Sequence, residues 1–273
     1  MGSKVNGSDS PQDSAQAALH VLVADDNAMN QDLTVRMLSR AGHTADVVND
    51  GTAALEALAG MAYDVVLVDM MMPGLSGLDV IRRYRETGGD VGRTPFIVLT
   101  ANATQEAAEL ARDAGAAAYL TKPIQPKTLR TTIEQVVSQV QVAEPDLPAG
   151  ETGLAMATGG QALIAEDVFE ETLGLIGDVE RARGFIDRFC GDTERLIGQI
   201  DSAIGEGRLA EVRDLAHAIK GSAAYLGAKR MVAASEYLQR ASVPDLQANG
   251  SQALDRLQGV YRETRDALLT RLA

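Results

Sequence analysis

Five polar residues in the first half of the chain stand at the ends of short apolar runs. They are Asp25 and Asp26 after the first run, Asp69 after the third, Thr100 after the fourth and Lys122 after the fifth. Converging carboxylates repel one another unless a cation bridges them, and Mg²⁺ suits a site built from oxygen ligands. A hydroxyl and an ammonium beside them would meet phosphoryl oxygens while one carboxylate attacks phosphorus. A strand-end Asp alone is more simply a helix cap, but the ordered set indicates a phosphoryl site.

A single histidine in the second half invites a related interpretation. His217 lies in an apolar-periodic stretch over 208–228. At about 100° per residue, it falls about 140° from Val212, the centre of the apolar stripe. We therefore expect the imidazole to face solvent, which suits transient phosphorylation on nitrogen. The absence of a second nearby His argues against a metal site, and no serine nucleophile motif precedes it.

The neighbours of His217 would suit a docking protein. Gly221 lies one turn further on and leaves room for close approach, although Gly in a helix interior costs about 1 kcal/mol relative to Ala. Arg213 and Lys220 flank the same surface and could balance phosphoryl charge. An ordinary solvated helix face is the alternative interpretation of both cations.

The first half has the pattern of a parallel α/β fold. Its apolar runs, rich in Val, Ile and Leu, are typical of strands buried on both faces. They cover 20–25, 45–48, 63–69, 95–100 and 116–121, and helical stretches follow them at 28–41, 51–60, 76–87, 104–114 and 126–141. This alternation predicts a doubly wound, five-stranded parallel sheet. Such sheets bind ligands at the carboxyl ends of their strands, where the five polar residues would meet.

The second half shows no strand pattern and predicts an antiparallel helical bundle. Helices are expected at 165–176, 178–205, 208–226, 228–242 and 249–271. Gly191 or Gly198 could interrupt the second of them, and the stretch from Pro244 to Gly250 is expected to be a connection. Between the two halves, 143–160 contains two Pro and four Gly, as a linker would.

Composition narrows the functional classes. The chain has 273 residues and a net charge of −13, which argues against nucleic-acid or anionic-membrane partners. One cysteine excludes intramolecular disulfides and cysteine-based zinc sites, and a cytoplasmic location fits best. Neither a signal peptide nor a membrane span is expected, and the polar start over 1–18 is expected to be a disordered tail or leader.

The first half resembles the receiver domain of two-component response regulators. The matching stretches are VLVADDN (21–27), DVVLVDMMMPGLSG (64–77), IVLTANA (97–103) and YLTKPI (119–124). The resemblance implies a flavodoxin-like fold with Asp69 as phosphoryl acceptor. It also implies that Asp26, Asp69 and the carbonyl of Met71 bind Mg²⁺, with Asp25 acting mainly through metal-bound water. Thr100 and Lys122 would hold phosphoryl oxygens, beside a cis Lys122–Pro123 bond.

Tyr119 stands at the aromatic switch position of that family, although ordinary packing beside the last strand is an alternative. The second half resembles the histidine phosphotransfer (HPt) domain through HAIKGSAAYLGA (217–228). That resemblance implies a phosphoryl acceptor at His217, with Lys220 and Gly221 shaping the docking surface.

These expectations define a two-module chain of a bacterial phosphorelay. A receiver over 19–142 accepts a phosphoryl group on Asp69 from a histidine kinase, and an HPt domain over 161–273 relays it through His217 to or from a downstream response regulator. The sequence shows no ATP-binding kinase region and resembles the C-terminal part of hybrid sensor histidine kinases. The alternative is a regulatory binding module, or a phosphoryl sink, without onward transfer.

Overall fold

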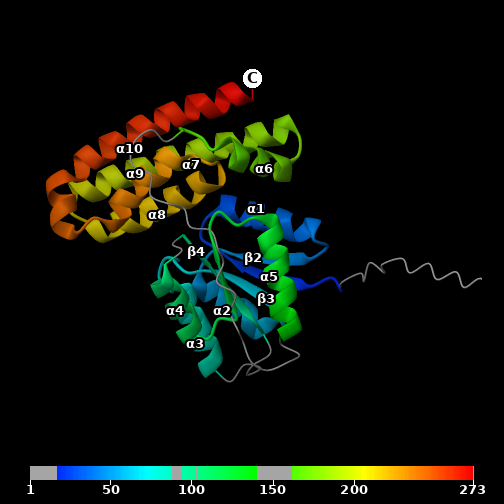
Figure 1. The fold of residues 1–273 in the computed structure, drawn as a ribbon. Helices are drawn as coiled ribbons and strands as arrows, with labels where there is room; N and C mark the ends of the chain where they lie inside the picture. The colour runs from blue at the N-terminus through cyan, green and yellow to red at the C-terminus, as the bar shows by residue number, and fades with distance from the viewer. Residues whose placement is uncertain (1–16, 88–93, 102–103, 140–161, 273) are drawn as a thin grey trace, which may run out of the picture.

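The chain forms an α/β layer structure that packs against a bundle of helices (Figure 1). The computed structural model describes residues 17–87, 94–101, 104–139 and 162–272. The expected linker over 143–160 lies outside these residues, as does the expected tail over 1–18 except for its last two positions. The domain boundaries therefore stay predictions. Within the described residues, no helix is long and apolar enough to cross a membrane.

The first half contains the predicted sheet. Its strands are β1 (His20–Ala24), β2 (Thr44–Val48), β3 (Val65–Asp69), β4 (Phe96–Thr100) and β5 (Ala118–Thr121). All neighbouring pairs are parallel, in the order β2-β1-β3-β4-β5. Every residue of β3 and β4 is buried, which explains their unalternated apolar sequences. The prediction of a doubly wound five-stranded parallel sheet is confirmed.

Five helices cover the two faces of this sheet. They are α1 (Ala28–Arg40), α2 (Gly51–Gly60), α3 (Gly77–Glu86), α4 (Gln105–Asp113) and α5 (Pro126–Gln139). Buried residues of α1 and α5 share one apolar cluster, and those of α2, α3 and α4 share another. Polar side chains directly after the strands start several helices. Asn27, for example, accepts hydrogen bonds from the amides of Met29 and Asn30 at the start of α1.

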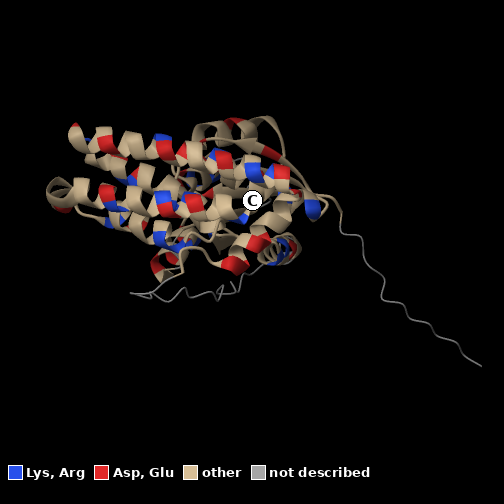
Figure 2. Ribbon diagram, turned by 90° about the horizontal axis from the view of Figure 1, so that it is seen from above, with Lys and Arg blue, Asp and Glu red and all other residues tan. Residues whose placement is uncertain are grey.

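The second half is the predicted helical bundle. It consists of α6 (Glu166–Ile176), α7 (Val179–Gly205), α8 (Leu209–Tyr225), α9 (Lys229–Arg240) and α10 (Val243–Arg271). Acidic and basic residues are mixed along the helices in Figure 2. Some of them form ion pairs between helices, such as Arg230 with Glu263. Helix α7 runs without a break through Gly191 and Gly198.

The expected connection between Pro244 and Gly250 is wrong, because α10 begins at Val243. Ser242 and Asp245 form a capping box at its start, and Pro244 occupies the first turn, where a missing N–H costs no helical hydrogen bond. Gly250 is buried within α10, where an added Cβ would lie 3.4 Å from a side-chain carbon of Ile204 on α7. Its role is therefore close helix packing rather than a turn.

The bundle is docked on the receiver half through α1 (Figure 1). Asn27 Nδ2 donates to Ser222 Oγ at 2.7 Å and to the carbonyl of Ala218 at 3.3 Å. At the other end of α1, Arg40 Nη2 donates to the carbonyl of Gly174 at 2.5 Å, near the C-terminus of α6. The buried side chains of both halves join in one apolar cluster that continues across this contact.

Gly77 begins α3 against the strand that carries Asp69, and this contact generates a prediction. A Cβ at Gly77 would collide with the backbone carbonyl of Asp69. Gly77→Ala should therefore destabilise the receiver half by about 1–3 kcal/mol, measured by urea denaturation. The matched control is Gly60→Ala, because an added Cβ there meets nothing within 4 Å. Equal stability of the two variants would contradict this account of the helix start.

Candidate functional site

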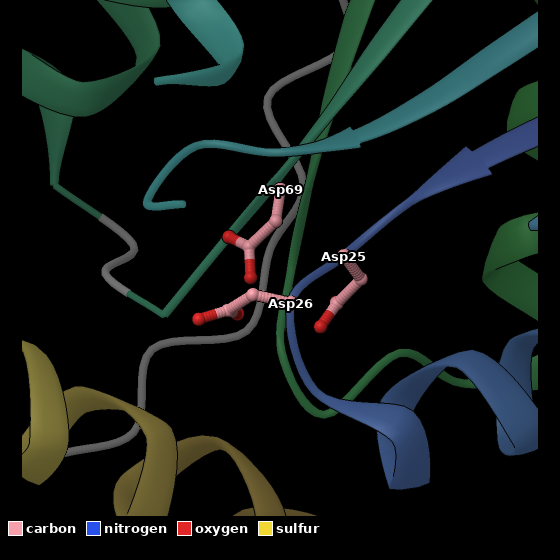
Figure 3. Close-up of side chains that lie close together, drawn as sticks. All are labelled: Asp25, Asp26 and Asp69. Carbon is pink, nitrogen blue, oxygen red and sulfur yellow. The ribbon is translucent and has the colours of Figure 1, made fainter. Parts of the chain in front are cut away.

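Three carboxylates converge at the carboxyl end of the sheet. Asp25 and Asp26 follow β1, Asp69 ends β3, and their side chains point toward one another (Figure 3). One carboxylate oxygen from each lies within 4.8 Å of the others. Asp25 and Asp69 are buried at 1% exposure each, whereas Asp26 is more exposed. The topology thus brings together the three acidic residues that the sequence singled out.

Lys122 lies between two of these carboxylates. Its Nζ is 2.6 Å from Asp25 Oδ2 and 2.5 Å from Asp69 Oδ2. Burial opposes the charged ammonium, but the two carboxylates raise the pKa of Lys122 above its ordinary value. Lys122 is therefore a buried permanent cation that both carboxylates share.

One ammonium does not balance three carboxylates. Burial, followed by the charges of Asp69 and Asp25, raises the pKa of Asp26 to about 7. Burial likewise raises the pKa of Asp25, although Lys122 works in the opposite direction. A cluster of oxygen ligands with excess negative charge and one partly open side fits a hard divalent cation, and Mg²⁺ commonly keeps several waters in such sites. The residues present therefore fit the expected metal.

The remaining predicted receiver residues surround this cluster. Thr100 ends β4 at 3% exposure, and its carbonyl accepts a hydrogen bond from the Lys122 amide at 2.7 Å. The Met71 amide donates to Asp69 Oδ1 at 3.2 Å, while the Met71 side chain is 43% exposed. The Lys122–Pro123 peptide bond is cis, as expected. Tyr119 lies half-buried in β5 against the apolar cluster of α2 and α3, and its switch role stays a prediction.

The expectation that His217 faces solvent is wrong, because its exposure is 7%. The periodicity of α8 correctly predicts the side chains that fill the bundle core, among them Val212, Ile219 and Ala223. The face that carries His217 is covered by the receiver half instead. One turn further on, Ser222 accepts the hydrogen bond from Asn27, and a Cβ at Gly221 would lie 3.4 Å from Asn30 Nδ2.

A polar group from the next helix orients the imidazole. Gln239 Nε2 lies 2.8 Å from His217 Nδ1, and Lys220 Nζ lies 3.5 Å from Gln239 Oε1. The ammonium of Lys220 favours the amide oxygen on its side, which turns the amide nitrogen of Gln239 toward the ring. Lys220 is 5% exposed and also pairs with Glu236 at 3.5 Å. It therefore belongs to a buried network rather than to a solvated face.

Arg213 lies outside this network. Its Nη2 donates to the carbonyl of Ala241 at 2.8 Å, just after the C-terminus of α9. Its expected role in docking stays a prediction.

Motif reasoning missed Gln239 and Asn27. Gln239 stands 22 residues after His217, and only the packing of α8 on α9 brings the two together. Asn27 ends the VLVADDN stretch (21–27), and its position directly before a helix indicates a helix cap. Its second contact, with Ser222, depends on the docking of the halves.

The electrostatic environment keeps His217 neutral. Burial first, and then the charges of Lys122 and Lys220, lower the pKa of His217 to about 4. A neutral imidazole retains a nitrogen lone pair, which attack on phosphorus requires. Because Lys122 belongs to the acidic cluster of the receiver half, its influence shows that the cluster and the imidazole share one electrostatic environment.

Comparisons with known proteins identify the two halves separately. Residues 21–134 match the family model of the response regulator receiver domain, and residues 184–270 match that of the Hpt domain. The chain therefore belongs to the two-component phosphorelay proteins, as a receiver domain followed by an HPt domain.

Two relatives are sensory proteins. The sensory/regulatory protein RpfC of Xanthomonas campestris is 32% identical over 257 residues, which are 93% of this chain and 35% of RpfC. The virulence sensor protein BvgS of Bordetella pertussis is 29% identical over 221 residues, or 80% of this chain and 18% of BvgS. The chain thus spans about a third or less of these relatives.

Among solved structures, the chain is similar to the receiver domain of sensor histidine kinase PA1611 from Pseudomonas aeruginosa, which holds a magnesium ion in its active site cleft. The identity is 31% and the TM-score 0.42, over 45% of this chain and 99% of that one.

The buried imidazole predicts that acid weakens docking. The docked pKa of about 4 lies below the ordinary 6.5, so protonation favours an undocked state in which the imidazole meets water. The stability of the docked state should be complete above about pH 6.5 and fall as the pH drops toward 4. NMR titration of the His217 ring measures this directly, and His217→Gln should remove this component from the pH dependence of docking. A ring that titrates near 6.5 in the full chain would contradict the docked arrangement.

Proposed function

We propose that Asp69 and His217 exchange a phosphoryl group within one chain. The domain composition establishes phosphorelay signal transduction as the functional class. The single observation that supports transfer within the chain is the docked interface: the turn that follows His217 contacts Asn27 and Asn30, directly after the acidic pair at the end of β1. This contact supports a transfer in which the donor and acceptor sites face each other in the docked chain.

The proposed reaction has two transfers. A carboxylate oxygen of Asp69 first attacks the phosphorus of a phosphohistidine on a histidine kinase, and the P–N bond of the donor breaks. A ring nitrogen of His217 then attacks the acyl phosphate, its P–N bond forms, and the P–O bond to Asp69 breaks and restores the carboxylate. The ring proton leaves to solvent or base. Both phosphorylated species are energetic, so the second transfer runs in either direction.

The chain's own residues prepare these steps. Thr100 and Lys122 would contact phosphoryl oxygens, and the ammonium would offset their charge as Asp69 is released. Gln239 contacts the imidazole at Nδ1, which leaves Nε2 as the reacting nitrogen. Attack from Nε2 requires the ring proton to move from Nε2 to Nδ1, with the Gln239 amide turned so that its Oε1 accepts from Nδ1–H. Asp25, Asp26, Asp69 and the carbonyl of Met71 would hold Mg²⁺. That ion, when bound, supplies charge neutralisation at the phosphoryl group.

The partners proposed for this chain are a histidine kinase and a downstream response regulator. The kinase would be a separate protein or another part of the same parent, and the second option is compatible with the chain matching only 35% of RpfC and 18% of BvgS. We place the relay in the cytoplasm, where such kinases present their phosphohistidine.

A labelling time course tests the relay. A cognate kinase with radiolabelled phosphate should label wild type first at Asp69, with hydroxylamine-labile label, and then at His217, with acid-labile label. Asp69→Ala should abolish labelling at His217, and His217→Gln should trap label on Asp69. Removal of Mg²⁺ should prevent the first step. Normal labelling of His217 in Asp69→Ala would exclude the internal route. Label that stays on Asp69 in wild type, even with a downstream regulator present, would favour a binding module without onward transfer.

The contact between Arg40 and α6 generates a second prediction. The Arg40 guanidinium donates to the carbonyls of Gly174 and Leu175, at 2.5 and 3.3 Å. Arg40→Ala should weaken the docked state by about 0.5–1.5 kcal/mol, the usual range for one hydrogen bond, because solvent screens the exposed guanidinium, and it should slow internal transfer. Loading of Asp69 should not change. The control is Arg82→Ala, which removes an exposed arginine paired with Asp79 on α3. Transfer at the wild-type rate in Arg40→Ala would show that the reaction uses another arrangement.

A further inference from the structure

Tyr225 is a large buried side chain on the docking face of α8. It is the last residue of the helix and is 2% exposed. At about 100° per residue, it points about 80° from His217, between the directions of Gly221 and Ala218. The Ala218 carbonyl accepts a hydrogen bond from Asn27, which caps α1 of the receiver domain, and a Cβ at Gly221 would lie 3.4 Å from Asn30 Nδ2 on α1. Tyr225 is therefore directed away from the bundle core and into the interface.

Tyr225 belongs to the apolar cluster that also contains Leu120 and Ile124, which stand two residues before and two residues after Lys122. Burial raises the pKa of Tyr225 well above its usual range, Lys122 lowers it, and Asp25 raises it again. The backbone amide of Ile124, two residues after Lys122, also lowers this pKa. Asp25 follows β1, and Lys122 and Ile124 follow β5, at the carboxyl end of the receiver sheet that holds the shared ammonium.

This hydroxyl is not satisfied in the resting structure. The oxygen is buried and makes no hydrogen bond of normal geometry within the described residues, although the Ile124 amide lies nearby. Burial of a hydroxyl without a hydrogen bond is unfavourable. Phenylalanine would fill the same space without that penalty. The packing of the resting interface therefore gives no reason for the hydroxyl.

Phosphorylation would change the hydrogen bonding of Lys122. An ammonium has three donors, and two of them now reach Asp25 and Asp69. When Asp69 carries a phosphoryl group, the donor that reaches Asp69 must turn to a phosphoryl oxygen. A fixed acceptor on the opposite side would hold the ammonium in that new position.

We propose that Tyr225 is a positioning residue for the phosphotransfer. Its hydroxyl reaches across the docked interface to the segment from Lys122 to Ile124. There it accepts a hydrogen bond from the Lys122 ammonium once the phosphoryl group has drawn that ammonium away from Asp69. The phosphoryl group is thereby held for attack by His217 only while the HPt domain is docked. This inference rests on the proposed transfer between Asp69 and His217.

The test compares Tyr225→Phe with wild type in the full chain. Asp69 is loaded with radiolabelled acetyl phosphate, and the rate at which acid-labile label appears on His217 is measured. The rate should fall about tenfold, as expected for loss of one hydrogen bond to a charged group. Loading of Asp69, measured in a His217→Gln background, should not change. The matched control is Tyr237→Phe, because Tyr237 lies on α9 at 50% exposure.

A stability measurement distinguishes a positioning role of the Tyr225 hydroxyl from a role in packing. Tyr225→Phe should unfold at the same or a higher urea concentration than wild type, because it removes an unsatisfied buried hydroxyl. Transfer at the wild-type rate would overturn the proposal. A slower transfer that accompanies a lower unfolding midpoint would also overturn it, since the hydroxyl would then serve packing. If wild type itself moves no label from Asp69 to His217, the proposed relay fails first and the role of Tyr225 fails with it.

Discussion

The site depends on the burial of one ammonium between two carboxylates. Lys122 contacts both Asp25 and Asp69 in a place that water hardly reaches, and buried charges of this kind persist only when they are paired. The pairing fixes where β1, β3 and β5 must end relative to one another. It also leaves a surplus of negative charge at Asp26, which is the physical reason that the pocket fits a divalent cation. The parallel sheet brings the ends of these strands together, so that the buried charged groups are paired with one another.

Much of this site could be predicted from the sequence, because its residues occupy topologically fixed positions. Polar residues that end the strands of a parallel sheet lie together at the carboxyl edge of that sheet. The sequence alone therefore predicts that Asp25, Asp69 and Thr100 lie close to one another. Their roles in transfer are still proposals. Gln239 and Tyr225 belong to no such rule, since their positions depend on how α8 packs against α9 and against another domain. Nothing in their local sequence distinguishes them from surface or core residues.

Two expectations are wrong: His217 does not face solvent, and the stretch from Pro244 to Gly250 is not a connection but part of α10. The periodicity of α8 identifies the face that leaves the bundle core, but it does not identify what covers that face. Pro244 and Gly250 usually break helices, yet a capping box makes the first position suitable and a close neighbour helix makes the second suitable. Tertiary context thus decided the outcomes at His217 and Gly250, whereas the local capping box of Ser242 and Asp245 decided the outcome at Pro244.

Because the receiver half covers one face of α8, it also affects how an outside protein could reach His217. An outside receiver that takes the phosphoryl group from His217 needs access to the surface that the chain's own receiver occupies through Asn27 and Arg40. A tethered partner acts at an effective concentration that reaches the millimolar range for short flexible linkers. An untethered competitor must therefore bind more tightly or wait for the tethered domain to leave. In the proposed relay, the rate at which the two halves separate would thus limit how often the signal can pass onward.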